Sequence, residues 1–224
     1  TTPCDNISHM TQNWKKLNEI QTNKLTPMLR QYLEAKTGSG DSLLFFRMGD
    51  FYELFFDDAL EAAELLGIAL TSRDAVTKDE RIPMAGVPVR SVDGYIARCL
   101  KAGRTVAICE QIEDPRDAKG IVRRAIVRTI TPGTLIETDL IDETTNNYLA
   151  ALILRNDNAG LAFLDVTTGE FLAAQFQNAP ERALIDELTR MAPAEILVTS
   201  LDAPPIESLR ASFDGTRFTP WPEH

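Results

Sequence analysis

The run from Leu43 to Phe56 constrains the fold of this chain more than any other stretch. Two apolar, aromatic-rich segments, residues 43–48 and 51–56, flank the pair Gly49-Asp50. Apolar runs separated by two residues of this kind predict a β-hairpin. A helix is the alternative, because apolar runs this short do not reveal their period. We interpret the segment as a hairpin around which the rest of the chain is organised.

The choice between hairpin and helix decides how Phe51 and Glu53 relate to each other. On a strand, residues two positions apart point to the same face, whereas on a helix they do not. A ring and a carboxylate side by side suit a wedge and a hydrogen-bond acceptor that act on one target. Pattern alone favours a simpler interpretation, in which Phe51 is core and Glu53 faces solvent.

Four segments of the chain carry a more specific signal, and they are Phe46–Phe55, Ile82–Pro88, Val106–Ile112 and Thr131–Thr134. In this order they resemble the N-terminal region of the MutS family of bacterial DNA mismatch-recognition proteins. The likeness is close over residues 25–134 and looser over the remainder. It implies that mispaired or unpaired bases are recognised by aromatic wedging of Phe51 and by base hydrogen bonding to Glu53.

The resemblance also implies secondary DNA contacts at Arg73, Met84 and Arg90. For Met84 a place in the core is the competing interpretation. For Arg73 and Arg90 the competing interpretation is an ordinary surface arginine. A basic set on one further segment, Arg123, Arg124 and Arg128, is expected to form a solvated face, and steering of DNA at low salt is the alternative interpretation.

The family likeness implies an α/β fold class with two domains. A mixed-sheet mismatch-recognition domain is expected at residues 25–134, a linker at 135–146, and a ribonuclease H-like connector domain at 147–224. Three strand-like runs, a helix and a strand after residue 147 give the order βββαβ, which also resembles the ribonuclease H-like fold. Residues 1–24 show no sustained period and are expected to be a poorly ordered N-terminus or residues added for expression.

Partners and cofactors follow from the resemblance alone. The sequence is expected to be a fragment of a longer protein that acts as an ATP-driven homodimeric clamp with Mg²⁺. The fragment itself is expected to hold no cofactor, to bind mismatched double-stranded DNA and to have a MutL-like repair partner. A cytoplasmic, nucleoid-associated location is implied, and the sequence has no apolar run of about 18 residues that would indicate a membrane span.

The net charge of −10 at first argues against nucleic acid. Residues 1–134, however, hold 18 Lys and Arg against 18 Asp and Glu, whereas residues 135–224 hold 5 against 15. The acidic excess therefore belongs to the second region. This asymmetry supports an alternative function, in which the acidic connector domain is an interaction module that docks a repair partner such as MutL.

Catalysis in this chain is not expected. The sequence has no phosphate-binding P-loop and no nucleophile elbow. A ribonuclease H-like fold raises the hypothesis of a two-metal nuclease with Asp165, Glu170 and Asp186 as ligands. Their places on separate elements favour solvated surface carboxylates instead. Metal-ligand spacing is also missing from the thiols and imidazoles, which are Cys4, Cys99, Cys109, His9 and His224.

Local patterns predict the elements around the hairpin. Asp58 and Glu61 resemble a capping box that opens a helix over 59–66. Ile68–Thr71 is predicted to be a strand that leads into a polar loop over 74–81. Two prolines and a glycine predict that Ile82–Pro88 is a shaped loop and not a regular element.

Overall fold

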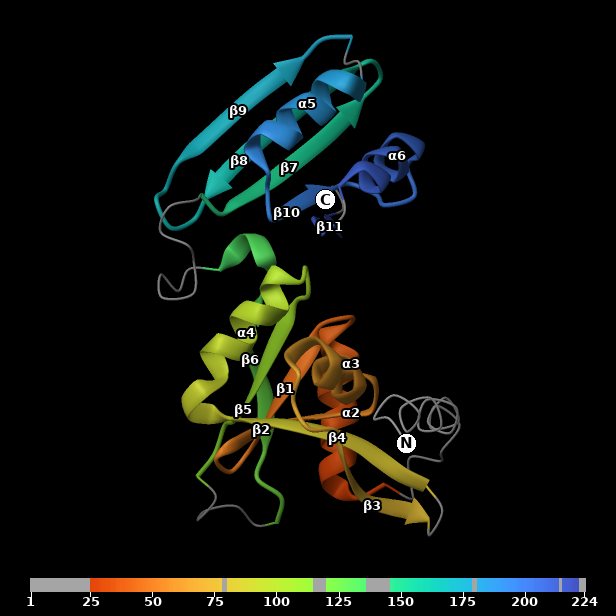
Figure 1. The fold of residues 1–224 in the computed structure, drawn as a ribbon, viewed down its shortest axis with the longest axis vertical. Coiled ribbons are helices and arrows are strands. Elements are labelled where there is room, and N and C mark those ends of the chain that lie inside the picture. Colours follow the sequence, from red (N-terminus) through yellow and green to blue (C-terminus); the bar gives the residue numbers. More distant parts are fainter. Residues whose placement is uncertain are drawn as a thin grey trace. The chain divides into compact units, whose positions relative to one another are not determined.

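The structure is a computed structural model that describes residues 25–77, 80–114, 120–135, 146–178, 181–213 and 215–221. The chain divides into two compact units, Thr1–Cys99 with Val106–Thr129, and Leu100–Thr105 with Ile130–His224. Each unit is built on its own mixed sheet, which confirms the expected α/β class (Figure 1). The N-terminal segment 1–24 and the linker residues 136–145, both predicted above, lie outside the described residues. No helix in the described ranges is long and apolar enough to cross a membrane.

The first unit places the hairpin in the middle of a six-stranded sheet with the order β3-β4-β2-β1-β5-β6. Its elements are α2 (Pro27–Ser39), β1 (Leu43–Met48), β2 (Phe51–Phe55), α3 (Phe56–Leu66), β3 (Thr71–Thr77), β4 (Glu80–Pro88), η3 (Val89–Ser91), α4 (Val92–Lys101), β5 (Val106–Gln111) and β6 (Arg124–Ile130). Strand β1 pairs antiparallel with β2 and parallel with β5. The two central strands of the hairpin are therefore held on both sides.

The predicted hairpin is confirmed, and the helical alternative is wrong. In the antiparallel pair, Phe46 lies opposite Glu53 and Met48 lies opposite Phe51. Gly49 occupies the first turn position with a φ of 59°. A positive φ at this position suits glycine, as in the type II′ hairpin turn. The local sequence was sufficient here because turn and strands are adjacent in the chain.

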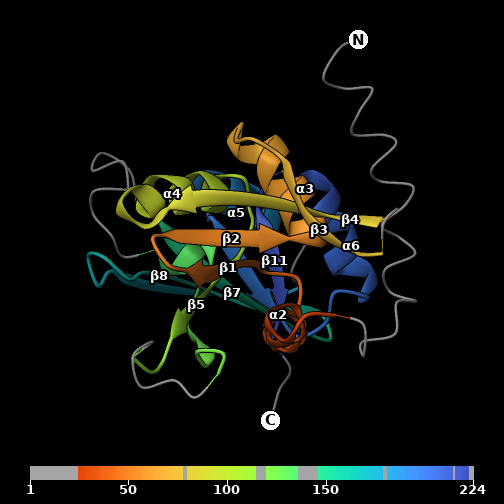
Figure 2. The ribbon, with the colours of Figure 1, turned by 90° about the horizontal axis from the view of Figure 1, so that it is seen from below.

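Helices cover both faces of this sheet. Figure 2 shows α2 on one side of β2, with α3 and α4 on the other. On the α2 side, the ring of Tyr32 meets Phe46 and Phe55 edge-to-face, at centroid distances of 5.4 and 5.0 Å. Both phenylalanines are fully buried. The hairpin is thus clamped between two hydrophobic layers.

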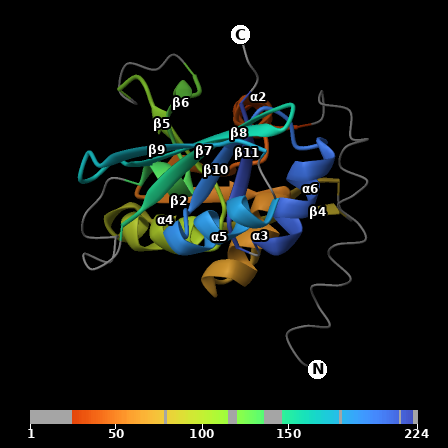
Figure 3. The ribbon, with the colours of Figure 1, turned by 90° about the horizontal axis from the view of Figure 1, so that it is seen from above.

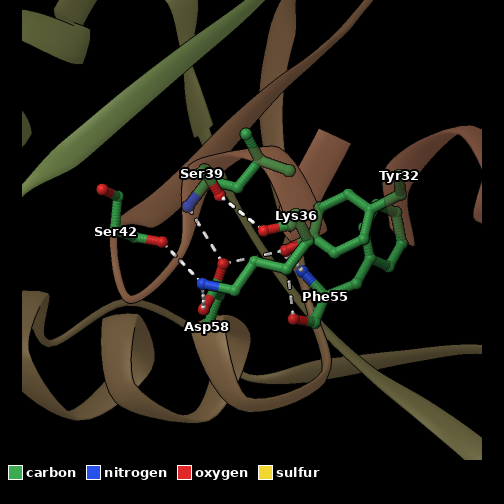
Figure 4. A network of polar contacts seen from close by, with 7 residues as sticks. Tyr32, Lys36, Ser39, Ser42, Phe55 and Asp58 are labelled. Carbon is green, nitrogen blue, oxygen red and sulfur yellow. Dashed lines mark hydrogen bonds and ion pairs between the residues drawn. The ribbon is translucent and has the colours of Figure 1, made fainter. Parts of the chain in front are cut away.

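The predicted capping box at Asp58 is wrong. Helix α3 begins at Phe56, and its N-cap residue Phe55 makes no side-chain capping bond. The buried Asp58 carboxylate instead accepts hydrogen bonds from the Leu44 amide at 2.9 Å and from the Tyr32 hydroxyl at 3.1 Å. It also forms an ion pair of 2.8 Å with Lys36 (Figure 4). An acid in the first turn satisfies buried donors on α2 and β1, and it joins three elements.

The predicted loop at Ile82–Pro88 is wrong, because these residues belong to strand β4. β4 pairs with β2 only from Met84 to Pro88, and with β3 from residue 80 to residue 84. Pro83 therefore lies beyond the last residue paired with β2, and Pro88 ends the strand. Pro83 thus occupies a position where a missing N–H breaks no ladder on the β2 side.

The predicted order of strand and loop before β4 is also wrong. The predicted strand at 68–71 has no regular structure before Thr71, and the predicted polar loop at 74–81 contains most of β3 and the start of β4. The pairing of β3 with β4 shifts register between Arg73 and Thr77. Polar residues form a strand here because β3 is the edge of the sheet, where one side needs no apolar neighbour.

The second unit has a five-stranded sheet with the order β11-β10-β7-β8-β9. Its elements are η4 (Pro132–Thr134), β7 (Tyr148–Arg155), β8 (Asn158–Asp165), β9 (Phe171–Phe176), α5 (Glu181–Met191), β10 (Glu195–Val198), α6 (Pro204–Ser212) and β11 (Arg217–Pro220). The predicted βββαβ order is confirmed, and α6 and β11 extend it. Both helices pack on the same face of the sheet, where Leu188 and Leu209 are fully buried (Figure 3).

Candidate functional site

Strand β2 carries the site, and its α2-side residues pass from buried to open along the strand. Phe55 is fully buried beneath Tyr32, Glu53 is half-buried, and Phe51 is 47% exposed. An exposed phenylalanine at the end of a strand leaves a flat apolar surface uncovered. Phe51 is thus available to contact a partner while its own strand stays fixed in the sheet.

Phe51 and Glu53 share one face, as the hairpin predicted. Gly86 of β4 lies directly opposite Glu53. A Cβ atom at Gly86 would lie 3.7 Å from Glu53 Cγ and 3.8 Å from Phe51 Cδ1. Both side chains therefore lean over the same glycine. Residue 86 adds no side chain of its own to this part of the face.

Tyr52, between these two residues, fastens β2 to the opposite face of the sheet. The guanidinium of Arg47 lies 5.5 Å from the centroid of the Tyr52 ring, and the Tyr52 hydroxyl donates a hydrogen bond to Glu110. Burial, followed by the neighbouring Glu110, raises the pKa of Tyr52 to about 12. The hydroxyl is consequently neutral and a hydrogen-bond donor over the whole physiological range. The hydrogen bond to Glu110 holds the turn end of the hairpin on the sheet face opposite to Phe51 and Glu53.

The turn itself is tied to the end of β4. The Val89 amide donates to the carbonyl oxygen of Asp50 at 2.9 Å, and Pro88 lies opposite Phe51. Arg90, the next residue, is exposed beside this tip. One predicted secondary contact therefore directly follows, in the chain, the residues that hold the turn.

The other two predicted contacts lie farther along the strands. Met84 lies opposite Phe55 and packs against the core under α2, so its partly buried side chain supports the core interpretation. Arg73 lies on β3 opposite Ile82, and its side chain is outside the described part of the chain. A DNA-contacting role for these residues, and for Arg90, stays a prediction.

Arg124 was expected on a solvated face, and for this residue the expectation is wrong. Its Cζ atom lies 5.0 Å from the centroid of the Phe46 ring. Its Nε donates to the Arg47 carbonyl oxygen at 2.7 Å, and its Nη1 donates to Gln31 Oε1 at 3.0 Å. Alternating basic residues indicated an exposed edge, but Arg124 turns inward because Phe46 and α2 offer it a ring and acceptors.

The carboxylates of the nuclease hypothesis lie in the second unit. Asp165 is buried, so its description as a solvated carboxylate is wrong. It accepts hydrogen bonds from the amides of Asn147, Thr167 and Thr168 and from the Thr167 hydroxyl. Burial opposes its ionisation, yet these hydrogen bonds prevail and lower its pKa.

The two other candidate ligands are not assembled around Asp165 into a metal site. Glu170 accepts hydrogen bonds from Tyr148 and Asn146. Asp186 belongs to helix α5. Within the described ranges, no group of three or more His, Cys, Asp or Glu residues could hold a metal ion.

Comparison with known families gives a match for each unit. A family model described as MutS domain I matches residues 26–139. A second, described as MutS domain II, matches residues 147–223. Together the two matches contain the hairpin, β4, β6 and the whole second sheet.

Curated relatives give the same result. The DNA mismatch repair protein MutS of Methanothrix thermoacetophila is 50% identical over 186 residues, which cover 83% of this chain and 21% of that protein. The protein of the same name from Syntrophobacter fumaroxidans is 48% identical over 200 residues, with coverages of 88% and 22%. The one from Clostridioides difficile is 48% identical over 192 residues, with coverages of 86% and 20%. The chain spans about a fifth of the length of these relatives.

Proposed function

Because the chain belongs to the MutS family of DNA mismatch repair proteins, we propose that its first unit recognises mispaired or unpaired bases through Phe51 and Glu53. One observation carries the proposal: an exposed ring and a half-buried carboxylate stand together over Gly86 on one sheet face. The rest of that strand is buried. A rigid strand thus presents an apolar wedge beside a hydrogen-bond acceptor.

Phe51 would act on base stacking. A mispaired step stacks poorly and bends at low cost, whereas unstacking a regular step costs a few kcal/mol. A ring inserted beside the weak step restores stacking, which contributes on the order of 1–3 kcal/mol per base. Phenylalanine suits this position because its ring has no polar group that needs a partner.

Glu53 would test the edge of a base. An ionised carboxylate is an acceptor only, so it requires a free N–H donor. A paired base keeps that donor occupied, and mispairing releases it. The negative charge also disfavours approach to phosphates, which penalises intact duplex DNA. The ring and the carboxylate together would therefore favour sites where the duplex bends easily and a base also offers a free N–H donor.

The test is a titration of this chain with a G·T duplex and its matched control at low ionic strength. Low salt is needed because residues 1–134 carry no net charge and phosphate-driven affinity is weak. Phe51→Ala is expected to lower G·T affinity on the order of tenfold and to leave the matched duplex unchanged. Phe171→Ala is the control, because Phe171 is also exposed, at 64%, but lies on β9 of the second unit.

Two results would count against the proposal. One is equal affinity for both duplexes that Phe51→Ala does not alter. The other is an equal loss in Phe51→Ala and Phe171→Ala. The first result would favour the alternative function, in which the acidic second unit docks a protein partner such as MutL.

For the longer protein we infer the activities that the family name carries. It would act in DNA mismatch repair as a homodimer, use ATP and Mg²⁺ in parts outside this sequence, and work in the cytoplasm with a MutL-like partner. The sequence in hand would supply the recognition step and no catalysis. ATPase measurements on the full-length protein, with and without Phe51→Ala, would separate recognition from hydrolysis.

A further inference from the structure

A row of four residues crosses the sheet beneath the site. Gly86, Glu53, Phe46 and Cys109 lie directly opposite one another on the neighbouring strands β4, β2, β1 and β5. Side chains of opposite residues on one face are about 5 Å apart at Cβ. The Phe46 ring is therefore the immediate neighbour of the Glu53 side chain, on the side away from Gly86.

Arg124 reaches this row from β6 and lies over the ring beside Glu53. Four contacts fix its guanidinium: the Phe46 face, the carbonyl oxygens of Arg47 and Val122, and Gln31 Oε1. Each of these four partners is uncharged. They hold the group in place but bring no negative charge to it.

Glu53 is an acid close enough to act on this charge through space, because it lies opposite Phe46 in the sheet. Burial lowers the pKa of Arg124, while Cys109 and Glu53 act to raise it. Burial also raises the pKa of the Cys109 thiol to about 11, so Cys109 is neutral at physiological pH. Of these two neighbours, Glu53 is the carboxylic acid, a group whose ordinary form at neutral pH is the anion. Arg124 keeps its proton in any case, because guanidinium does not titrate in proteins.

We propose that Arg124 is a positioning residue for Glu53, held on the Phe46 ring so that it keeps the carboxylate ionised and directed toward the base edge. This inference rests on the proposed function of Glu53. An ionised carboxylate accepts hydrogen bonds only, whereas a protonated one also donates. Arg124 thereby makes the site selective for bases that offer a free N–H, although it touches no DNA itself.

The binding test compares Arg124→Gln, Arg124→Lys and Arg123→Gln in the G·T and matched titrations from pH 5 to pH 8. Arg124→Gln is expected to reduce the G·T preference at the acid end of this range, by at most about tenfold for a change of one pKa unit, and to leave it unchanged at pH 8, where a carboxyl is ionised in either case. The loss begins at a higher pH than in the unaltered chain, because removal of a cation favours the protonated acid. Arg124→Lys keeps the charge and rescues most of the preference.

Arg123→Gln is the matched control. It removes the same charge from the adjacent residue, but Arg123 is exposed and pairs with Glu113 at 3.2 Å. We expect its G·T preference and pH profile to match those of the unaltered chain. A loss equal to that of Arg124→Gln would mean that general charge, and not positioning, is measured, and would overturn the proposal.

A double-mutant cycle separates positioning from direct DNA contact. In a Glu53→Gln background, Arg124→Gln is expected to cause no further loss of G·T preference. Equal weakening of both duplexes in both backgrounds would identify Arg124 as a phosphate contact and overturn the proposal. Urea unfolding of each variant shows whether it folds. If Arg124→Gln does not fold, the pH profile of Arg124→Lys is used for the test in its place.

A DNA-free measurement distinguishes failure of this inference from failure of the proposed function. The Glu53 carboxyl carbon can be titrated by NMR in each variant. Its transition is expected to move to higher pH in Arg124→Gln and to stay unchanged in Arg123→Gln. A moved transition without any effect of Glu53→Gln on DNA binding would sink the proposed function alone. An unchanged transition in Arg124→Gln would refute the proposed effect of Arg124 on Glu53.

Discussion

The substitution Asp58→Ala gives the most direct test of how the hairpin of β1 and β2 is held. It removes the acceptor of the buried Leu44 amide, one of two acceptors of the buried Tyr32 hydroxyl, and the ion-pair partner of Lys36. A buried donor without a partner costs about 1–3 kcal/mol. Lys36 is partly exposed and reaches water, so its own cost is smaller. One orphaned buried amide, one lost hydrogen bond of Tyr32 and a partly exposed ion pair together give an expected loss of unfolding free energy of about 2–4 kcal/mol.

Asp57→Ala is the matched control, because Asp57 is the exposed acid that precedes Asp58 in the first turn of α3. If Asp58 acted through the helix dipole, the two substitutions would cost the same, about 0.3–1 kcal/mol each. Urea unfolding followed through the NMR amide signals of Leu44 and Phe46 reports this unit separately from the second one. Equal losses in the two variants would refute the network reasoning. Asp58→Asn, which keeps one acceptor oxygen, is expected to fall between them.

Two further predictions use the same unfolding assay. Gly133→Ala is expected to lower the free energy of unfolding by about 1–3 kcal/mol through overpacking, because its Cβ would lie 2.9 Å from Leu149 Cδ1. Gly86→Ala meets ordinary contacts and is expected to change the free energy of unfolding by about 1 kcal/mol or less. Equal costs for the two alanines would contradict this contrast. Tyr52 has a folded pKa of about 12, above the unfolded value near 10, so its contribution to stability is complete below pH 10 and is lost as the pH rises to 12. Tyr52→Phe is expected to flatten the fall in stability between pH 10 and pH 12. Absorbance at 295 nm follows tyrosine ionisation, and an unchanged tyrosine titration near pH 12 in Tyr52→Phe would contradict the assignment of this pKa to Tyr52.

Sequence reasoning succeeded where structure is decided locally. The turn at Gly49 and the flanking apolar runs predicted the hairpin, and the hairpin in turn predicted that Phe51 and Glu53 share a face. The βββαβ order of the second unit was readable for the same reason, since each strand and turn carries its own pattern. The roles of Phe51 and Glu53 came from the family resemblance and stay predictions.

The errors arose where the deciding partner is distant in sequence. A first-turn acid such as Asp58 has the same local pattern whether it caps its helix or binds donors 14 and 26 residues away. Pro83 excludes a strand only if strands continue on both sides, and that depends on where β2 ends. Arg124 was counted as solvated because its alternation resembles an exposed edge, while its acceptors are on α2 and β1.

Strand β2 gives the proposed recognition residues a rigid support that a flexible loop would lack. A wedge must separate bases at a cost of a few kcal/mol, and a side chain that first had to be ordered would lose part of its binding energy to conformational entropy. Here Tyr52 and Leu54 are buried on one face, and Phe55 is buried on the other. Phe51 therefore projects from a strand already fixed in the sheet. The stability of the hairpin and the discrimination of the site should thus fall together when these anchors are weakened.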